Sequence, residues 1–297
     1  MKILITGASG FVGSHFANLI SDKKCVVRKN SMHFFDNTFE VDRIDGRTNW
    51  EGAFDNIDTV VHLAGVAHTK NCDTNDFKEV NVEGTVRLAE EAIAANVRRF
   101  IFVSSIGVNG NRTYGNALSH QSRTKPYNSY SNSKFDAEIE LMELCRCADM
   151  ELVIIRPTLV YGVDAPGSFS TLVKFVKLSP VLPFGLVNNR RSFISVENLS
   201  DLLKCCCYHP NAAGKVFLAS EAKPMSIKQF TQHISSCYGL RRYQLFIPIW
   251  LMRLLGRGIN RLDTVNQLVS DLEVDSSYTY ECLGWVPPYD ITDSLKS

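Results

Sequence analysis

Hydrophobic positions in the first half of the chain follow two alternating spacings. Short apolar runs, typical of buried strands, are separated by longer stretches in which apolar residues return every three or four positions, as on a helix. The strand-like runs are 2–6, 25–28, 59–65, 98–105 and 151–162, and the helix-like stretches are 11–22, 82–97 and 129–148. Strands and helices that alternate in this way predict βαβ units and a doubly wound parallel sheet of the α/β class.

The pattern changes after Tyr161. Loop-like residues rich in Pro and Gly follow, helical spacing returns at 196–209, one more strand-like run occupies 215–220, and the tail is mostly helical. We therefore expect the chain to leave the sheet, return to it and leave again. The predicted division is a first domain of residues 1–162 plus about 192–220, and a small, mostly helical, discontinuous C-terminal lobe of about 163–191 plus 221–297.

A glycine-rich loop joins the first strand-like run to the first helix. Gly7, Gly10 and Gly13 lie at the start of that helix, where backbone N–H groups and the helix dipole favour an anion. Glycine also lets the chain turn tightly and approach a pyrophosphate closely. A glycine triplet is a weak signal alone, but at the start of a βαβ chain it predicts a dinucleotide-binding Rossmann domain rather than a structural turn.

The end of the second strand indicates which dinucleotide binds. An Asp or Glu there would hold the ribose 2′-hydroxyl of NAD, but this chain has Arg28 and Lys29. Because a cation suits a 2′-phosphate, these residues favour NADP(H). NAD remains the alternative, as does a solvated Arg28 with no role in binding.

Tyr130 and Lys134 lie four residues apart in a predicted helix and therefore share a face. A free tyrosine has a pKa near ~10, and a neighbouring ammonium is expected to lower it. The pair can then exchange a proton with a hydroxyl while a nicotinamide takes or gives hydride. Ser105 ends the strand-like run 98–105, at the sheet edge where ligands bind, and can donate to the substrate oxygen. Ser104 beside it can contact the cofactor.

Composition limits the classes of partner. The 32 Lys and Arg balance the 31 Asp and Glu, which argues against a nucleic-acid binder driven by bulk charge. No uncharged apolar run reaches the ~18 residues of a membrane span, and we expect neither a signal peptide nor a membrane partner. The nine cysteines form no CxxC pair, so we expect free thiols in a reducing, cytoplasmic setting, without a disulfide framework or a metal.

Six short motifs occur together in this order: GASGFVG, VVHLAG, NVEGT, FVSS, YSNSK and RPTLVYG. Over nearly the whole chain this set resembles the extended short-chain dehydrogenase/reductase family, the NAD-dependent nucleotide-sugar epimerase, dehydratase and reductase group. The resemblance implies a catalytic triad of Ser105, Tyr130 and Lys134. The cofactor contacts expected from the resemblance and from the residues are Gly7, Ser9, Gly10, Phe11, Val12, Gly13, Arg28, Leu63, Ala64, Gly65, Asn81, Ser104, Tyr130, Lys134 and Pro157. For Asn81 a helix N-cap is an equal interpretation, and for Leu63 and Ala64 a place in the sheet core.

Two residues are candidates for the substrate besides Ser105 and Tyr130. Residues 190–201 resemble the family segment in which an arginine grips the nucleotide diphosphate, and that role falls on Arg191. A solvated basic turn is the alternative. His68 follows the strand-like run 59–65 and can approach the sugar, although a surface histidine is an equal interpretation. Asn109 stands where many relatives have a tyrosine.

The resemblance leaves more than one reaction open. Sugar 4,6-dehydratases carry an Asp-Glu pair after the catalytic Thr, whereas Ser105 is followed by Ile106 and Gly107, which argues against dehydration. The lead hypothesis is a UDP-4-keto-sugar reductase of the UDP-quinovosamine type, because Arg28 and Lys29 suit a released NADP(H). The alternative is a UDP-glucose or UDP-N-acetylhexosamine 4-epimerase. A non-catalytic NAD(P)-binding sensor is a remote third, since a sensor does not need the triad.

The expected partner is a nucleotide-sugar of the UDP-hexose class, and a homodimer through a helix pair would suit the family. Residues 246–259 are apolar but include Arg253 and Arg257. We expect this segment to pack in the substrate lobe, and docking on a membrane or a lipid-linked sugar is the alternative.

Overall fold

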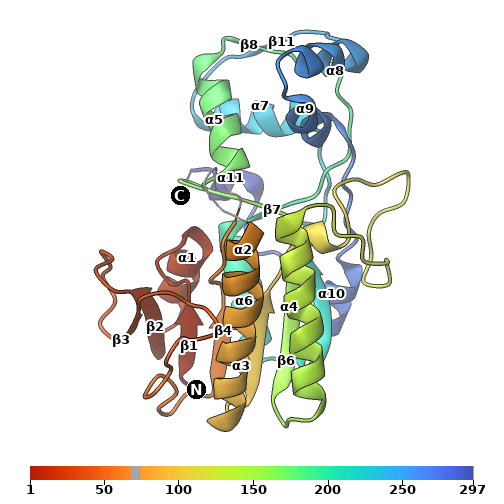
Figure 1. Cartoon of the computed structure of the whole chain (residues 1–297). Coiled ribbons are helices and arrows are strands. Elements are labelled where there is room, and N and C mark those ends of the chain that lie inside the picture. The colour runs from red at the N-terminus through yellow and green to blue at the C-terminus, as the bar shows by residue number, and fades with distance from the viewer. Residues whose placement is uncertain (68–73, 297) are drawn as a thin grey trace.

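A seven-stranded parallel sheet forms the centre of the protein, whose computed structural model describes residues 1–67 and 74–296 (Figure 1). Across the sheet the strands run in the order β10-β6-β5-β4-β1-β2-β3. Their bounds are β1 Ile3–Thr6, β2 Lys23–Arg28, β3 Thr38–Val41, β4 Thr59–His62, β5 Arg99–Val103, β6 Glu151–Pro157 and β10 Lys215–Ala219. The chain builds outwards in both directions from the β1–β4 pair, which confirms the doubly wound Rossmann fold and places its ligand crevice at that pair.

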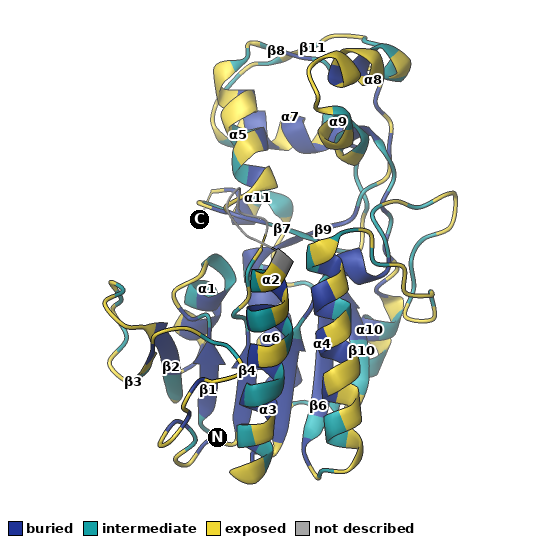
Figure 2. Cartoon of the chain, in the orientation of Figure 1, coloured by how far each residue is buried: buried dark blue, intermediate teal, exposed yellow. Residues whose placement is uncertain are grey.

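Helices cover both faces of this sheet. Helices α1 (Phe11–Leu19) and α6 (Val196–Tyr208) lie on one face, and α3 (Gly84–Ala94) and α4 (Ser129–Arg146) on the other. The alternation of side chains in β1 shows the division: Ile3 and Ile5 join the core under α1 and α6, and Leu4 joins the core under α3 and α4. Figure 2 shows the strands as buried, with the exposed residues on the outer faces of the helices.

A smaller lobe lies beyond the carboxyl ends of the strands (Figure 1). Its core gathers apolar side chains that include Phe169, Phe184 and Phe230. The elements around that core are α5 Ser168–Leu178, β8 Val181–Leu182, α7 Ile227–Cys237, β11 Tyr243–Gln244, α8 Ile249–Gly258, α9 Leu262–Val269 and α11 Ile291–Ser294. Strands β8 and β11 pair in parallel. The helices of the described ranges are all too short or too polar to cross a membrane.

The structure differs from the predicted elements at 151–162. This run is two strands, because β6 ends at Pro157, and β7 (Leu159–Tyr161) pairs instead with β9 (Phe193–Ser195) in a separate two-stranded sheet. Proline has no N–H with which to continue the ladder. The break sends Tyr161 into the core of the smaller lobe.

The predicted domain boundaries stay a prediction, with one difference at the C-terminal end. Helix α10 (Ser277–Leu283) was assigned to the second lobe, but Leu283 and Trp285 pack in the core cluster that contains Ile3 and Ile5. The remaining short elements are α2 (Thr74–Asp76), η1 (Phe77–Glu83), η2 (Ile106–Val108) and η3 (Pro210–Ala212).

Candidate active site

The glycine loop between β1 and α1 is folded so closely that side chains do not fit. A Cβ at Gly13 would lie 2.0 Å from the Gly7 oxygen, and a Cβ at Gly7, whose φ is +69°, would lie 2.7 Å from the Ala64 nitrogen. The Gly10 N–H donates to the Gly7 oxygen over 2.9 Å and closes the turn. The first N–H groups of α1 have no acceptor within the helix and so can face an anion.

A pocket of about 550 Å³ opens beside this loop, between the loop and the start of the smaller lobe. Its lining consists of Ser9, Gly10, Phe11, Ser14, His15, Val163, Asp164 and Pro166. The pocket therefore joins the predicted phosphate loop to the second lobe, as a bound dinucleotide requires. Phe11 lies on its wall, and a Cβ at Gly162 would lie 3.2 Å from the Phe11 ring.

Ser104 and Gly65 extend the candidate cofactor site along the sheet edge. The Ser104 side chain is buried, and its hydroxyl meets no hydrogen-bond partner within residues 1–67 and 74–296. A buried polar group without a partner costs about 1–3 kcal/mol, which a bound ligand can offset. A Cβ at Gly65 would lie 3.2 Å from both the Lys134 Nζ and the Asn81 Oδ1. The absence of a side chain at Gly65 and the unpartnered Ser104 hydroxyl both suit a dinucleotide that lies across the ends of β1 and β4.

The catalytic candidates come together because of how α4 begins. Asn128 and Ser131 form a capping box, in which the Asn128 Oδ1 accepts from the Ser131 N–H over 2.8 Å. This cap places Tyr130 in the first turn and Lys134 one turn later. The Lys134 ammonium donates to the Val103 oxygen, the last residue of β5, over 3.0 Å. Lys134 thus meets the strand end that carries Ser105.

Ser105 faces the start of α4 across Gly107. Its hydroxyl accepts from the Gly107 N–H over 3.1 Å. A Cβ at Gly107 would lie 3.3 Å from the Ser105 Oγ and 3.2 Å from the Tyr127 ring. The missing side chain lets Tyr127 and Ser105 approach each other. Neither Tyr127 nor Gly107 belongs to one of the six motifs, so the sequence does not mark their place in the site.

Arg191 reaches this site from the second lobe. Its guanidinium is half-buried and donates to the Ser270 oxygen over 3.0 Å, and burial lowers its pKa to about 10. Burial raises the pKa of Tyr127, while a hydrogen bond to Asn128 and the charge of Arg191 oppose that rise. The solvated-turn interpretation is therefore wrong for Arg191. It fits Arg190, which is exposed and pairs with Glu273 over 2.6 Å.

Burial, and not the neighbouring ammonium, dominates the acid–base character of Tyr130. Burial raises the pKa of Tyr130 to about 12, with a further contribution from Tyr127. Burial lowers the pKa of Lys134 to about 8, against the opposing effect of Glu138. The net shift of the Tyr130 pKa is therefore upward, opposite to the direction that the Tyr130–Lys134 spacing predicts. Tyr130 is a phenol at neutral pH, and Lys134 is mostly an ammonium.

Asn81 clamps the segment after β4 to helix α4. It lies within the π-helix η1 and is fully buried. Its Oδ1 accepts from the Val66 N–H over 2.7 Å, and its Nδ2 donates to the Val66 oxygen and the Ser133 Oγ, each over 3.0 Å. The helix N-cap interpretation is therefore wrong, because Asn81 is inside a helix. π-Helical turns are often found at functional sites, and this one holds Gly65 against Lys134.

A buried ion pair anchors the same helix to β6. Glu138 is fully buried and accepts from the Arg156 Nε over 3.0 Å, and the Arg156 Nη1 donates to the Asn109 Oδ1 over 3.0 Å. Glu138 lies one turn beyond Lys134, so Tyr130, Lys134 and Glu138 share a face of α4. The four-residue spacing is a sequence signal for the position of Glu138 on this face, but not for its pairing with Arg156.

His62 links the ends of β1 and β4 through a directed chain of hydrogen bonds. The Thr85 hydroxyl donates to the Asn81 oxygen over 2.8 Å, so the His62 Nε2, 2.9 Å from that hydroxyl, must be the donor to it. The His62 Nδ1 then accepts from the Thr6 hydroxyl over 2.6 Å. Burial and the charge of Lys134 lower the pKa of His62 to about 3.

The buried neutral His62 predicts loss of stability in acid. A histidine in the unfolded chain has a pKa of about 6.5. Below that pH, His62 is protonated in the unfolded chain but stays neutral in the folded protein. The contribution of His62 is complete above pH ~6.5 and is lost as the pH falls towards about 3. We expect urea unfolding to show a free energy of unfolding that falls across this range. His62→Gln should be less stable at pH 7 but should lose less stability on acidification; an unchanged pH slope in this variant would contradict the assignment.

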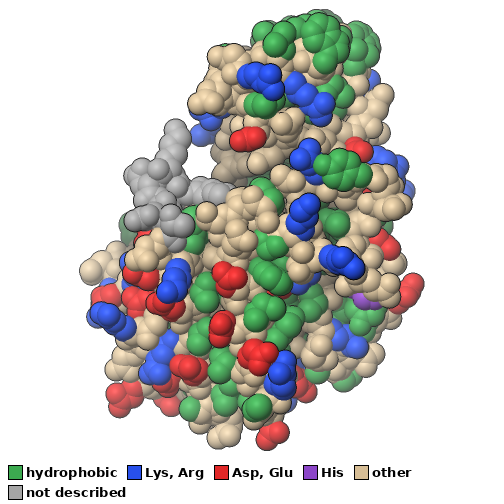
Figure 3. All heavy atoms as spheres, turned by 45° about the vertical axis from the view of Figure 1, so that its right-hand side comes forward, with side chains coloured by type: hydrophobic (Ala, Val, Ile, Leu, Met, Phe, Trp, Pro, Cys, Tyr) green, Lys and Arg blue, Asp and Glu red, His purple; other side chains and the backbone are tan. Residues whose placement is uncertain are grey.

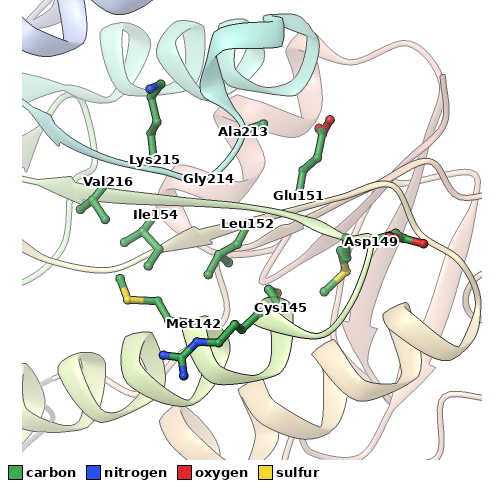
Figure 4. A pocket seen from close by; sticks show the side chains of 12 residues that line it. Met142, Cys145, Asp149, Glu151, Leu152, Ile154, Ala213, Gly214, Lys215 and Val216 are labelled. Atoms are coloured by element: carbon green, nitrogen blue, oxygen red, sulfur yellow. The ribbon is translucent and has the colours of Figure 1, made fainter.

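A second pocket, of about 600 Å³, lies away from this site (Figure 4). It lies between the end of α4 and strands β6 and β10, at the opposite end of β6 from Pro157. The Glu151 carboxylate there is paired with Arg98 and Arg99, and burial raises the pKa of the Cys145 thiol to about 11. The pocket therefore offers no reactive thiolate, and its Glu151 carboxylate is already paired.

The remaining predicted residues are placed as follows. Arg28 is exposed at the end of β2, and Lys29 beside it pairs with Asp42 over 3.0 Å. Leu63 packs partly against the sheet core, as one interpretation expected. Pro157 is buried at the end of β6. His68 lies outside the described residues.

Comparisons with known proteins agree with this geometry. The model of the NAD dependent epimerase/dehydratase family matches residues 3–219. A UDP-glucose 4-epimerase of Vibrio cholerae is 37% identical over 306 residues, which cover 99% of this chain and 93% of the relative. An N-acetyl-alpha-D-glucosaminyl-diphospho-ditrans,octacis-undecaprenol 4-epimerase of Escherichia coli O157:H7 is 25% identical, with 99% and 93% covered. The crystal structure of a UDP-glucuronic acid 4-epimerase from Bacillus cereus in complex with NAD superimposes with a TM-score of 0.79 at 19% identity, covering 100% of this chain and 96% of that one, and shares the fold.

Proposed function

The chain belongs to the NAD dependent epimerase/dehydratase family, and we propose that it inverts the C4 hydroxyl of a UDP-linked hexose with NAD as cofactor. The observation that carries this proposal is that Lys134, one turn beyond Tyr130 on α4, donates to the last residue of β5, directly before Ser104 and Ser105. The similarity to a UDP-glucose 4-epimerase over nearly the whole chain supports inversion as the reaction.

This proposal reverses the order of the two leading hypotheses. The 4-keto-sugar reductase was preferred on the strength of Arg28 and Lys29. Arg28 is exposed and Lys29 pairs with Asp42, which gives the 2′-phosphate interpretation little support, while the relative just named supports the 4-epimerase. The UDP-quinovosamine-type reductase is the second candidate.

The cofactor would be held by the glycine loop, the bare edge at Gly65 and the hydroxyl of Ser104. Bound NAD supplies the group that accepts hydride from C4 and returns it. The phenolate form of Tyr130 would take the proton of the C4 hydroxyl as the hydride leaves C4. The phenol so formed would give the proton back to the oxygen as the hydride returns to the opposite face. Protons and electrons therefore balance, and no reductant is consumed.

Ser105 and Lys134 prepare Tyr130 for this exchange. The Ser105 hydroxyl donates to the C4 oxygen and fixes its distance from the phenol. The Lys134 ammonium would stabilise the phenolate of Tyr130, which is the form that can take the C4 proton. Because burial raises the pKa of Tyr130 to about 12, the phenolate needs this nearby charge.

Arg191 is proposed to bind the diphosphate of the substrate. Arg191→Ala is expected to raise the KM for the nucleotide-sugar about 10–100-fold and to change kcat much less, because a charged hydrogen bond of about 1.5–3 kcal/mol is lost. Arg190→Ala is the matched control and should behave as the unmodified protein. Steady-state kinetics measure both, and equal KM values for the two variants would remove the role of Arg191.

Incubation with candidate substrates tests the proposed reaction. Purified protein mixed with UDP-glucose or UDP-galactose, without added cofactor, should give the same equilibrium mixture from either side, as seen by anion-exchange chromatography. Mass spectrometry of the nucleotide released on denaturation should identify NAD. Consumption of NADPH only in the presence of a UDP-4-keto-sugar, with no interconversion, would establish the reductase instead.

A further inference from the structure

The tip of the smaller lobe carries a concentration of exposed apolar side chains. Figure 3 shows hydrophobic atoms gathered at this end of the molecule, with Lys and Arg directly beneath them. They come from two segments, 168–188 and 241–262, that meet where β8 pairs with β11. We call these two segments the lobe tip. Its exposed large apolar side chains are Phe175, Leu178, Leu186, Tyr243, Leu245, Phe246, Trp250, Leu254, Leu255 and Ile259.

Helix α8 has one face in the lobe and one outside it. Met252 and Gly256 are buried, and Gly256 lies so close to Val265 of α9 that a Cβ would be 2.7 Å away. On the other side Trp250 is 66% exposed and Leu254 is 58% exposed. Half of the helix therefore packs in the lobe as expected, and the outward half leaves an apolar surface unexplained by packing.

The charge of the lobe tip is of one sign. Its two segments contain seven Lys and Arg (Lys174, Lys177, Arg241, Arg242, Arg253, Arg257 and Arg261) and no Asp or Glu, although the whole chain has 32 basic against 31 acidic residues. Arg242 is used within the lobe, where it donates to the Val176 and Lys177 oxygens. Arg257 and Arg261 are exposed beside the apolar side chains.

Exposed apolar side chains together with exclusively positive charge limit the kinds of partner that the lobe tip can bind. If two copies of the chain met through the same face, the seven positive charges of one lobe tip would face the seven of the other. Repulsion between these like charges disfavours such a dimer. Apolar side chains, the Trp250 indole and neighbouring arginines suit a surface at which hydrocarbon chains meet phosphate groups. The ligand that presents both chemistries together is an anionic phospholipid surface.

We propose that the lobe tip docks this protein on anionic phospholipid bilayers. Phe246, Trp250 and Leu254 enter the boundary between headgroups and acyl chains, and Arg257 and Arg261 contact lipid phosphates. The start of α4 and the carboxyl ends of the strands, which carry the proposed catalytic residues, lie on the opposite side of the lobe (Figure 1). Docking by the tip therefore leaves the nucleotide-sugar site uncovered. The proposal is independent of which C4 reaction the site performs.

Vesicle binding by the full chain tests the proposal. Sedimentation with phosphatidylcholine vesicles that contain phosphatidylglycerol should carry the protein down, and pure phosphatidylcholine should bind it at least tenfold more weakly. Binding should weaken at high salt, because part of it is electrostatic. Of the three tryptophans, Trp50 and Trp285 are buried and Trp250 is exposed. A blue shift of tryptophan emission on binding therefore reports entry of Trp250 into the bilayer.

Two variants separate the apolar and the charged contributions. Trp250→Ser with Leu254→Ser should reduce binding at least tenfold and abolish the blue shift. Arg257→Glu with Arg261→Glu should reduce binding to anionic vesicles about 25-fold or more, at about fivefold per charge. The control is Tyr208→Ser, an exposed aromatic residue on α6, which should bind as the unmodified protein. All variants should keep their melting temperature and turnover, since the changed side chains are exposed.

Three results would overturn the proposal. The first is absence of binding to the anionic vesicles, and the second is unchanged binding by both double variants. The third is a concentration-dependent dimer, seen by mass photometry without vesicle binding and lost in Trp250→Ser with Leu254→Ser. That result would make the lobe tip an interface between copies of the chain.

Discussion

Replacing Tyr130 by Phe is expected to lower kcat about 10³-fold, because the ring stays in place and only the group that exchanges the C4 proton is lost. Tyr130 occupies the first turn of α4 within a shell that includes Phe77, whose ring centroid is 6.4 Å away. Phenylalanine keeps this packing, so the variant should fold and bind dinucleotide as the unmodified protein does. A coupled assay for UDP-galactose measures turnover, and fluorescence titration measures cofactor binding.

The matched control is Tyr208→Phe, which removes the same hydroxyl from an exposed tyrosine on α6. It should leave kcat unchanged. A Tyr130→Phe variant with kcat within about threefold of the unmodified protein would remove Tyr130 from the mechanism, since general acid–base groups contribute at least about a hundredfold.

Glu138→Gln is expected to cost about 3–5 kcal/mol of unfolding free energy, because it leaves the buried Arg156 guanidinium without its counter-charge. Both side chains are nearly or fully buried, at 0% exposure for Glu138 and 6% for Arg156. Urea unfolding measures the loss. The same variant removes the carboxylate that raises the pKa of Lys134, so any remaining activity should require a lower pH.

Glu140→Gln on the exposed side of the same helix is the control, and it should change the unfolding free energy by less than about 0.5 kcal/mol. Changing both partners, as in Glu138→Leu with Arg156→Met, should cost less than Glu138→Gln alone, because no unpaired charge remains buried. Equal losses for Glu138→Gln and Glu140→Gln would show that the pair does not anchor α4.

The fold could be predicted from the sequence because it depends on local patterns. The alternation of apolar runs and helical spacing identified six of the seven strands of the sheet, and the glycine loop located its switch point. The edge strand β3 was missed, because its four residues, Thr38–Val41, are too short and too mixed in polarity to stand out. The break in the run 151–162 was missed, since hydrophobic continuity hides the change of partner after Pro157. The packing of Leu283 and Trp285 against the sheet core was also missed. It depends on a late return of the chain to the sheet, which local hydrophobic spacing does not reveal.

The candidate site was predictable only where neighbouring residues form motifs. The glycine loop and the Tyr130–Lys134 spacing lie within short segments. Tyr127, by contrast, approaches Ser105 only because Gly107 has no side chain. The direction of the Tyr130 pKa shift was wrong, since a spacing of four residues says nothing of how deeply both groups are buried. The role of Asn81 depends on Val66 and Ser133, which are distant in the sequence.

Transfer of the C4 hydrogen tests the central claim most directly. UDP-glucose deuterated at C4 is incubated with the purified protein in ordinary water, without added reductant, and the products are analysed by NMR and mass spectrometry. Hydride transfer out and back at C4 predicts UDP-galactose that keeps its deuterium at C4. Loss of the deuterium to water, or no inversion until NADPH and a keto-sugar are supplied, would contradict the account.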